Sequence, residues 1–213
     1  MVTYGIIAVC VLVFLWQTSL PAKAQKLAVY ALGLVPASLL GHARLPAELA
    51  VVPPAATVVT AMFLHGGWLH LLGNLLYLWT FGNNVEEAMG HARFVVFYLA
   101  SGAAAAMAQA LPDPASTIPV VGASGAISGV LGAYLLLYPH ARVLVWVPIG
   151  GLLHLPAALV LGLWFLIQIL ASALSGEREG GIAFGAHMGG FIAGLVLVPI
   201  FRRPEVPLWG RPR

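Results

Sequence analysis

A serine between glycines and a histidine far along the chain are the residues of this sequence best suited to covalent chemistry. Ser124 lies in a Gly-x-Ser-Gly run at 122–125, directly after the proline-rich stretch 112–119. Such a turn entering a helix exposes the hydroxyl beside unpaired backbone N–H groups, which suit a developing oxyanion. His187 in its neutral form supplies the general base that a hydroxyl nucleophile needs. A serine among glycines also serves close helix packing, so this pattern alone leaves both interpretations open.

A second histidine and an asparagine lie four positions apart. His70 and Asn74 therefore share one face of a helix, from which both can donate hydrogen bonds to the same point. In an apolar helix, such a pair either holds neighbouring helices together or stabilises an oxyanion. Polar side chains are costly within a membrane span, and Ser128 is one more of them.

No carboxylate is placed to orient His187 within the apolar runs, so we expect a serine–histidine dyad rather than a triad. The sequence lacks both the paired membrane carboxylates of an aspartyl protease and the His-Glu-x-x-His pattern of a zinc protease. We expect neither a metal nor another cofactor. The seven acidic residues lie in loops, at the ends of apolar runs or in the tail: Glu48, Glu86, Glu87, Asp113, Glu177, Glu179 and Glu205.

The composition places these residues in a membrane protein. Of 213 residues, 61% are hydrophobic and 8% are charged, whereas about 25% of the residues of a soluble domain are charged. This excludes a water-soluble globule and a disordered chain. The single cysteine, Cys10, excludes a disulfide scaffold. The net charge of +3 is attributed to basic loops facing the cytoplasm rather than to nucleic-acid binding.

Charge-free runs predict an all-α, polytopic bundle of six transmembrane helices in a single domain, residues 1–213. Proline and glycine interrupt the run 143–175 at its start, so we expect a loop before the fifth span. Six arginines lie on the side of the chain ends and four basic residues on the other, which predicts a cytoplasmic C-terminus with a basic tail at 202–213. The expected spans are approximately 4–20, 69–85, 94–111, 124–139, 155–174 and 183–201.

Small residues recur along the fourth and sixth expected spans. Such stripes allow helix backbones to approach closely, which would bring His187 within hydrogen-bond reach of Ser124. The glycines are Gly125, Gly129 and Gly132 in the fourth span, and Gly181, Gly185, Gly189, Gly190 and Gly194 in or just before the sixth.

Taken in order, these motifs resemble those of the rhomboid family of intramembrane serine proteases, collinearly over residues 60–200. The motifs are His70-x-x-x-Asn74 in the second span, Gly122-x-Ser124-Gly125 opening the fourth, and Gly185-Ala186-His187 in the sixth. The resemblance implies that Ser124 is the nucleophile and His187 the general base. It implies an oxyanion hole formed by His70, Asn74 and the backbone N–H of Ser124. It also implies structural support from His65, Glu86, Gly122, Gly125 and Gly185.

Two positions depart from the family pattern, and one region resembles its substrate gate. Many members carry a Trp-Arg pair shortly before the second span, which the stretch 53–60 lacks. Members commonly place an aromatic ring four residues after the serine, where this chain has Ser128. The loop 175–181 and the fifth span resemble the segments that admit and cap the substrate in the family.

The sequence thus predicts an intramembrane serine endopeptidase that hydrolyses peptide bonds in or near transmembrane segments of membrane proteins. We expect a multi-pass protein of the bacterial inner membrane whose partners are substrate helices and the lipid bilayer, without nucleic acid. One alternative is a catalytically inactive relative that binds transmembrane helices. Another is a small transporter or channel, although the polar residues cluster at one depth. The sequence leaves the oligomeric state open.

Overall fold

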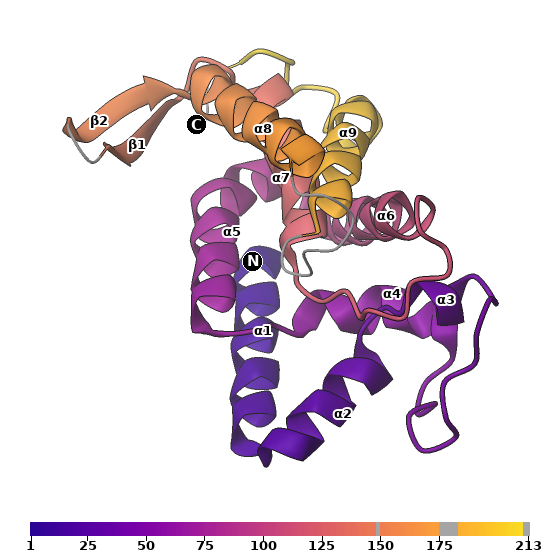
Figure 1. Cartoon of the computed structure of the whole chain (residues 1–213). Helices are drawn as coiled ribbons and strands as arrows, with labels where there is room; N and C mark the ends of the chain where they lie inside the picture. Colours follow the sequence, from indigo (N-terminus) through magenta and orange to yellow (C-terminus); the bar gives the residue numbers. More distant parts are fainter. Residues whose placement is uncertain (148–149, 175–182, 211–213) are drawn as a thin grey trace.

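Long apolar helices make up most of the chain, as the charge-free runs predict. The computed structural model describes residues 1–147, 150–174 and 183–210. A helix lies at each of the six expected ranges, with ends that differ from the expected ones by four residues at most. These helices are α1 (Val2–Ser19), α5 (Trp68–Met89), α6 (His91–Ala110), α7 (Ser124–Leu137), α8 (Ala157–Leu174) and α9 (Phe184–Phe201) (Figure 1).

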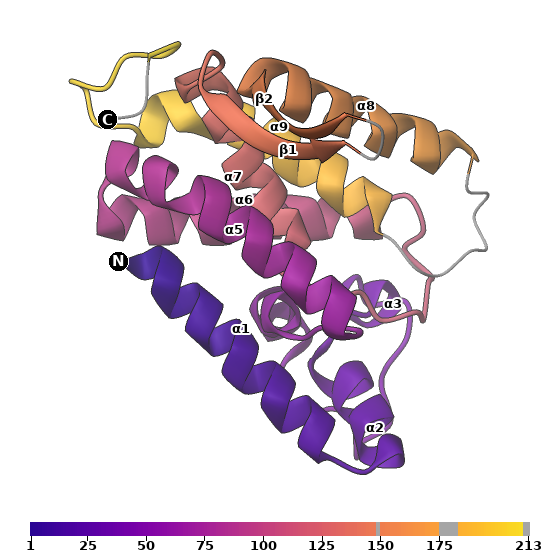
Figure 2. The same ribbon diagram turned by 90° about the vertical axis from the view of Figure 1, so that its left-hand side faces the viewer.

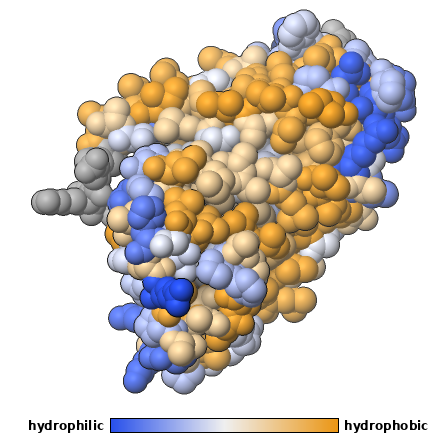
Figure 3. All heavy atoms as spheres, turned by 90° about the vertical axis from the view of Figure 1, so that its right-hand side faces the viewer, coloured by the Kyte–Doolittle hydropathy of each residue, from blue (hydrophilic) through white to orange (hydrophobic). Residues whose placement is uncertain are grey.

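Four of these helices, α1, α6, α8 and α9, are long and apolar enough to cross a membrane. The helix α5 adds a fifth candidate when it is joined to the helical segment Pro54–Phe63, to which it lies at an angle of 84°. The helix α7 has only 14 residues and is therefore about 21 Å long, shorter than the ~30 Å of hydrocarbon. A broad hydrophobic face lies between hydrophilic groups at two opposite ends of the molecule (Figure 3).

One segment differs from the expected loop, and it corrects the all-α prediction. The strands β1 (Arg142–Val147) and β2 (Gly151–Pro156) pair in antiparallel fashion and project from the helices as a hairpin (Figure 1). Valine at alternate positions of β1 favours a strand. Gly151, one of the residues that predicted a loop, is instead the first residue of β2 and adopts a positive φ of 72°.

Short helices between α1 and α5 are tied to the loop that precedes α7. Leu34 and Val120 exchange backbone hydrogen bonds of 3.0 and 2.8 Å. The Thr60 hydroxyl donates to the Leu32 carbonyl at 2.6 Å, which anchors the stretch that lacks the Trp-Arg pair. The elements of this region are α2 (Ala22–Leu32), α3 (Pro36–Leu39), η1 (Pro54–Ala56), α4 (Thr57–Thr60) and η2 (Ala61–Phe63).

The helix α7 lies at the centre of the molecule, and all of its residues from 125 to 134 are buried. Its backbone touches that of α9 at glycines. A Cβ atom on Gly190 would lie 2.0 Å from the Gly125 carbonyl oxygen, and one on Gly194 would lie 2.0 Å from the Gly129 carbonyl oxygen. Only residues without a side chain permit this approach.

The other glycines of α9 serve a different neighbour. Gly185 and Gly189 face α6, where added Cβ atoms would lie 2.9 Å from Gln109 Oε1 and 2.2 Å from Ala108 Cβ, respectively. Gly181, the first glycine of the predicted stripe, lies outside the described residues, as does the gate-like loop 175–181. The small-residue stripe of α9 is therefore divided between two helices.

The carboxylate of Glu86, a predicted support residue, holds the start of α1 against α5. Its side chain is fully buried and accepts hydrogen bonds from the backbone N–H groups of Val2 (2.7 Å) and Thr3 (2.8 Å). Its Oε2 atom also accepts a hydrogen bond from the Thr3 hydroxyl at 2.6 Å. Its Oε1 atom contacts His91 Nδ1. A carboxylate at the N-terminus of a helix accepts hydrogen bonds from its free N–H groups and interacts favourably with the positive end of the helix dipole.

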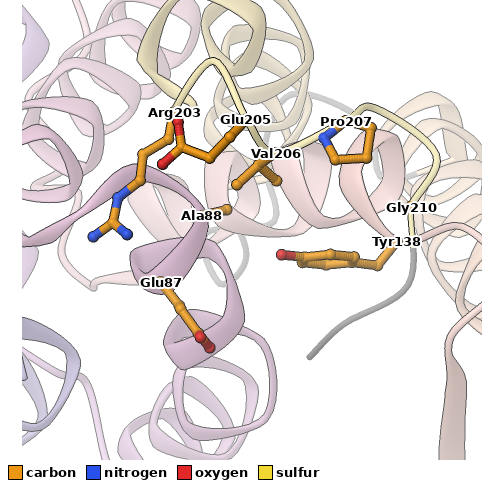
Figure 4. A pocket seen from close by; sticks show the side chains of 8 residues that line it. All are labelled: Glu87, Ala88, Tyr138, Arg203, Glu205, Val206, Pro207 and Gly210. Carbon is orange, nitrogen blue, oxygen red and sulfur yellow. The ribbon is translucent and has the colours of Figure 1, made fainter.

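The segment after α9 folds back over the ends of α5 and α7, on the same side of the molecule as the start of α1 (Figure 2). The Arg203 N–H donates to the Ala88 carbonyl at 2.8 Å, and the Trp209 N–H donates to the Leu136 carbonyl at 2.7 Å. Residues 211–213 of the predicted tail lie outside the described residues. The fold-back leaves a small pocket lined by Glu87, Ala88, Tyr138, Arg203, Glu205, Val206, Pro207 and Gly210 (Figure 4).

Candidate active site

The loop before α7 brings Ser124 to the first position of that helix. Gly122 has a φ of +125°, which side-chain-bearing residues rarely adopt. Its N–H donates to the Ala61 carbonyl at 2.8 Å, which fixes the loop against η2. Because Ser124 is the first residue of α7, its own N–H has no partner within the helix.

Ser124 and His187, which the sequence predicts as a dyad, lie within hydrogen-bond distance. His187 Nε2 is 2.9 Å from Ser124 Oγ, and both residues are partly buried. The contact joins the first turn of α7 to the first turn of α9, where the two helix backbones touch. A hydroxyl next to an imidazole nitrogen has the geometry for proton transfer.

The imidazole of His187 has a second partner that sequence reasoning missed. Gln168 Oε1 on α8 lies 2.7 Å from His187 Nδ1. Because an amide oxygen only accepts hydrogen bonds, Nδ1 carries the proton and Nε2 is left to accept one from Ser124. The only sequence signal was a lone glutamine in a charge-free run, which by itself does not reveal its partner.

A second glutamine, also missed, supports the backbone beside the histidine. Gln109 Oε1 on α6 accepts the N–H of Ala186 at 3.1 Å. That N–H belongs to the first turn of α9, where helix N–H groups have no partner in the helix. The close approach of Gly185 to Gln109 lets the amide reach it.

His70 and Asn74, the predicted oxyanion donors, lie on α5 at the same end of the molecule. The Gly66 N–H donates to His70 Nδ1 at 3.3 Å. A neutral His70 therefore carries its proton on Nε2. This nitrogen lies against Gly122, where an added Cβ would lie 2.7 Å away. Asn74 is 6% exposed, and its buried Nδ2 has no hydrogen-bond partner among the residues that the structure describes.

A family model described as "Rhomboid domain" matches residues 54–204 of this chain, more than half of its length. The chain belongs to the rhomboid family. The sequence-based prediction of the family is therefore confirmed. With its apolar helices, the chain is an integral, multi-pass membrane protein.

Several curated rhomboid proteins are similar to this rhomboid chain over about two thirds of its length. Rhomboid protein 1, mitochondrial, of Saccharomyces cerevisiae is 32% identical over 148 residues, which cover 66% of this chain and 40% of that protein. Rhomboid protease GluP of Bacillus subtilis is 30% identical over 154 residues, covering 72% and 27%, respectively. Rhomboid-like protein 11, chloroplastic, of Arabidopsis thaliana is 32% identical over 153 residues, covering 66% and 50%. The chain thus spans a quarter to a half of the length of these relatives.

His65, which the sequence predicts as a support residue of this rhomboid chain, is held by α1. Gln17 Oε1 accepts the His65 N–H at 3.0 Å, and Gln17 Nε2 lies 3.4 Å from the His65 carbonyl oxygen. The His65 ring lies edge-on to that of His70, with ring centroids 5.3 Å apart. The helix α1 therefore supports His70, the candidate oxyanion donor, through His65.

Ser128, one of the two predicted departures from the family pattern, donates its hydroxyl to the Ser124 carbonyl at 2.7 Å. An aromatic ring reaches His187 from α8 instead. The Trp164 ring lies 5.8 Å from that of His187, at an angle of 40°. Among the described residues, no group of three histidines, cysteines or carboxylates is arranged to hold a metal ion.

Proposed function

We propose that this rhomboid protein is an intramembrane serine endopeptidase that cleaves peptide bonds in or near the transmembrane segments of other membrane proteins. The observation that carries the proposal is the 2.9 Å contact between Ser124 Oγ and His187 Nε2. The family match and the protease named among the relatives support the same reaction. Six membrane crossings, with α5 and α7 counted as spans, are part of this proposal.

In the acylation step, His187 Nε2 takes the proton of the Ser124 hydroxyl while Oγ attacks the carbonyl carbon of the scissile bond. The carbonyl oxygen then carries a negative charge, which the Nε2–H of His70, the Asn74 amide and the Ser124 N–H stabilise. The imidazolium gives its proton to the leaving nitrogen, and the C–N bond breaks. The product is an ester between the substrate carbonyl and Ser124.

In the deacylation step, His187 takes a proton from water, whose oxygen attacks the ester carbonyl. Collapse of the second oxyanion returns the proton to Ser124 and releases the carboxyl product. The shortness of α7 helps here. A span of about 21 Å is shorter than the ~30 Å hydrocarbon layer, so Ser124 at its start lies below one membrane surface, and deacylation requires that water enters from that side.

The orientation of the protein in the membrane follows from the position of its basic residues. Ser124, His187 and His70 lie in the first turns of α7, α9 and α5, at the ends opposite the basic tail. The positive-inside rule puts that tail in the cytoplasm, so the site opens to the extracytoplasmic side. We place the protein in a bacterial inner membrane, with transmembrane substrates as its partners.

Two measurements test the function. Purified protein in liposomes is incubated with a single-span substrate, and Ser124 is labelled with a fluorophosphonate. We expect cleavage and labelling in the parent chain, no labelling of Ser124→Ala, and cleavage lowered at least about 10³-fold in both Ser124→Ala and His187→Ala. Full cleavage by both variants would disprove the dyad. Substrate association without labelling of the parent chain would indicate a helix-binding protein without catalysis.

A further inference from the structure

Gln168 is an unusual residue for its helix. The helix α8 is the most exposed of the candidate spans, and only Ala157, Leu161 and Gln168 are buried in it. A buried amide in an apolar surrounding is costly unless it is hydrogen-bonded. Gln168 therefore occupies one of the few buried positions of α8 with the side chain least suited to simple packing.

The two ends of the Gln168 amide have different partners. Its Oε1 lies 2.7 Å from His187 Nδ1, whereas its Nε2 lies 3.5 Å from the Trp164 carbonyl oxygen one turn earlier. The nitrogen has a carbonyl to which it can donate, and the oxygen has a ring N–H from which it can accept. Both contacts favour the same orientation of the amide.

This orientation has a consequence for the base. An acceptor at Nδ1 keeps the proton on that nitrogen and leaves the lone pair of Nε2 toward Ser124 Oγ, 2.9 Å away. When His187 accepts the serine proton, the Nδ1–H donor becomes positively charged. The hydrogen bond to Gln168 then strengthens, because charge-assisted hydrogen bonds are the stronger ones.

We propose that Gln168 is a positioning residue that sets the tautomer of His187 and stabilises its imidazolium form, so that Ser124, His187 and Gln168 act as a hydrogen-bonded series. This inference rests on the proposed proteolytic function. A neutral amide takes the place that a carboxylate holds in a serine triad, in a region where an ionised carboxylate would be costly.

The same helix also contacts the face of the imidazole. Trp164 precedes Gln168 by one turn, and its ring lies 5.8 Å from the His187 ring. Residues four apart share a helix face, so α8 presents both side chains to His187 together. The rotation of α8 about its axis therefore determines whether the base is held.

Few other groups influence the charge of His187. His70 on α5 interacts with it electrostatically. The sequences of α7, α8 and α9 contain no Asp, Glu, Lys or Arg, and α6 carries His91, which contacts Glu86, and Arg93. This arginine contacts the Arg202 carbonyl at the far end of α9. Gln168 is the only side chain shown to contact Nδ1 among the described residues.

The test compares Gln168→Met and Gln168→Glu with the parent chain in steady-state cleavage over a range of pH. Methionine keeps the length of the side chain but accepts no strong hydrogen bond, whereas glutamate keeps the acceptor. The matched control is Gln25→Met, the same substitution at an amide that donates to the Leu20 carbonyl, remote from the site. Thermal unfolding in detergent shows that each variant is folded.

For Gln168→Met we expect kcat to fall roughly 10- to 100-fold with KM nearly unchanged, and the acid limb of the pH–rate profile to move to lower pH. For Gln168→Glu we expect kcat within about tenfold of the parent and an acid limb at higher pH, because a carboxylate favours the imidazolium. Gln25→Met should match the parent in both quantities.

Three results overturn the inference while leaving the proteolytic function intact. They are an unchanged kcat and acid limb in a folded Gln168→Met variant, a glutamate variant no more active than the methionine variant, and acid limbs that coincide in all three proteins. An inactive parent chain would instead overturn the proposed function itself. A methionine variant that fails to fold leaves the glutamate comparison to decide, since glutamate must shift the acid limb upward.

Discussion

Asn74 carries a buried amide nitrogen without a hydrogen-bond partner among the described residues, in a side chain that is 6% exposed. Native proteins rarely leave a buried donor unpaired, and one explanation for such a donor is a catalytic role in which the acceptor arrives with the substrate. In the proposed mechanism the acceptor is the oxyanion of the substrate. The donor would be unpaired in the free enzyme and paired in the transition state, which is the condition for raising kcat.

Replacing Asn74 by leucine should therefore lower kcat by roughly 10²- to 10³-fold, the usual effect of losing one oxyanion donor. KM should change little, because the hydrogen bond forms mainly in the transition state. Steady-state cleavage of a transmembrane substrate measures both. Thr80→Val is the control on the same helix, since the Thr80 hydroxyl donates to the Leu76 carbonyl of its own helix. A leucine variant as active as the control would exclude Asn74 from the oxyanion hole.

The sequence predicted the site residues that are polar within an apolar run and whose spacing from another residue indicates a shared turn or helix face. Ser124 between glycines and the pair His70 and Asn74 meet that condition. Gln168 and Gln109 do not, because a single amide in an apolar run has no spacing that indicates its partner. Their contacts with His187 and Ala186 depend on how α8 and α6 rotate against α9, which a local pattern does not encode.

At the scale of elements, the candidate dyad depends on the contact between α7 and α9. Each helix carries one member of the dyad in its first turn. The helices meet where Gly190 and Gly194 of α9 lie against the backbone of α7. A side chain at either position would meet backbone atoms rather than the movable end of another side chain. Because moving backbone atoms costs more free energy than turning a side chain, the two helices would have to separate.

Gly194→Ala tests that contact two turns away from the chemistry. The added Cβ would lie 2.0 Å from the Gly129 carbonyl oxygen, so we expect destabilisation of about 1–3 kcal/mol and at least a tenfold loss of kcat. Thermal unfolding and cleavage, both in detergent, measure these effects. Gly162→Ala on α8 is the control, because nothing lies within 4 Å of its added Cβ. Equal stability and activity in the two variants would mean that α7 and α9 do not touch.

The extents of the helices were predictable, because an apolar run bounded by charge or proline leaves little choice within a bilayer. The β1–β2 hairpin was not predictable in the same way. Proline and glycine mark an irregular loop and a hairpin turn alike, and the apolar residues on both sides of the turn fit a span as well as a strand. The pairing of Val143 with Leu155 and of Val145 with Leu153 depends on a register that the run does not show.

At the scale of the whole molecule, several segments gather at one end and the candidate site lies toward the other. The start of α1 reaches Glu86 near the end of α5, Arg203 reaches Ala88, and Trp209 reaches the end of α7 at Leu136. The Arg93 side chain contacts the Arg202 carbonyl at this same end. Three arginines, Arg93, Arg202 and Arg203, thus mark one face, which the positive-inside rule assigns to the cytoplasm.

This arrangement predicts which exposed positions a membrane-impermeant maleimide reaches. Cys10 is fully buried, so a Cys10→Ala chain gives a background without reactive thiols, into which Lys26→Cys on α2 or Glu205→Cys after α9 is introduced. In inverted membrane vesicles, Glu205→Cys should react at once and Lys26→Cys only after detergent is added, because the two positions lie beyond opposite ends of the bundle. The cysteine-free parent controls for background labelling, and retained cleavage activity shows that each variant is folded. The reverse pattern would place the basic segment outside the cytoplasm and turn the candidate site toward it, whereas immediate reaction at both positions would contradict a bundle that separates them across the membrane.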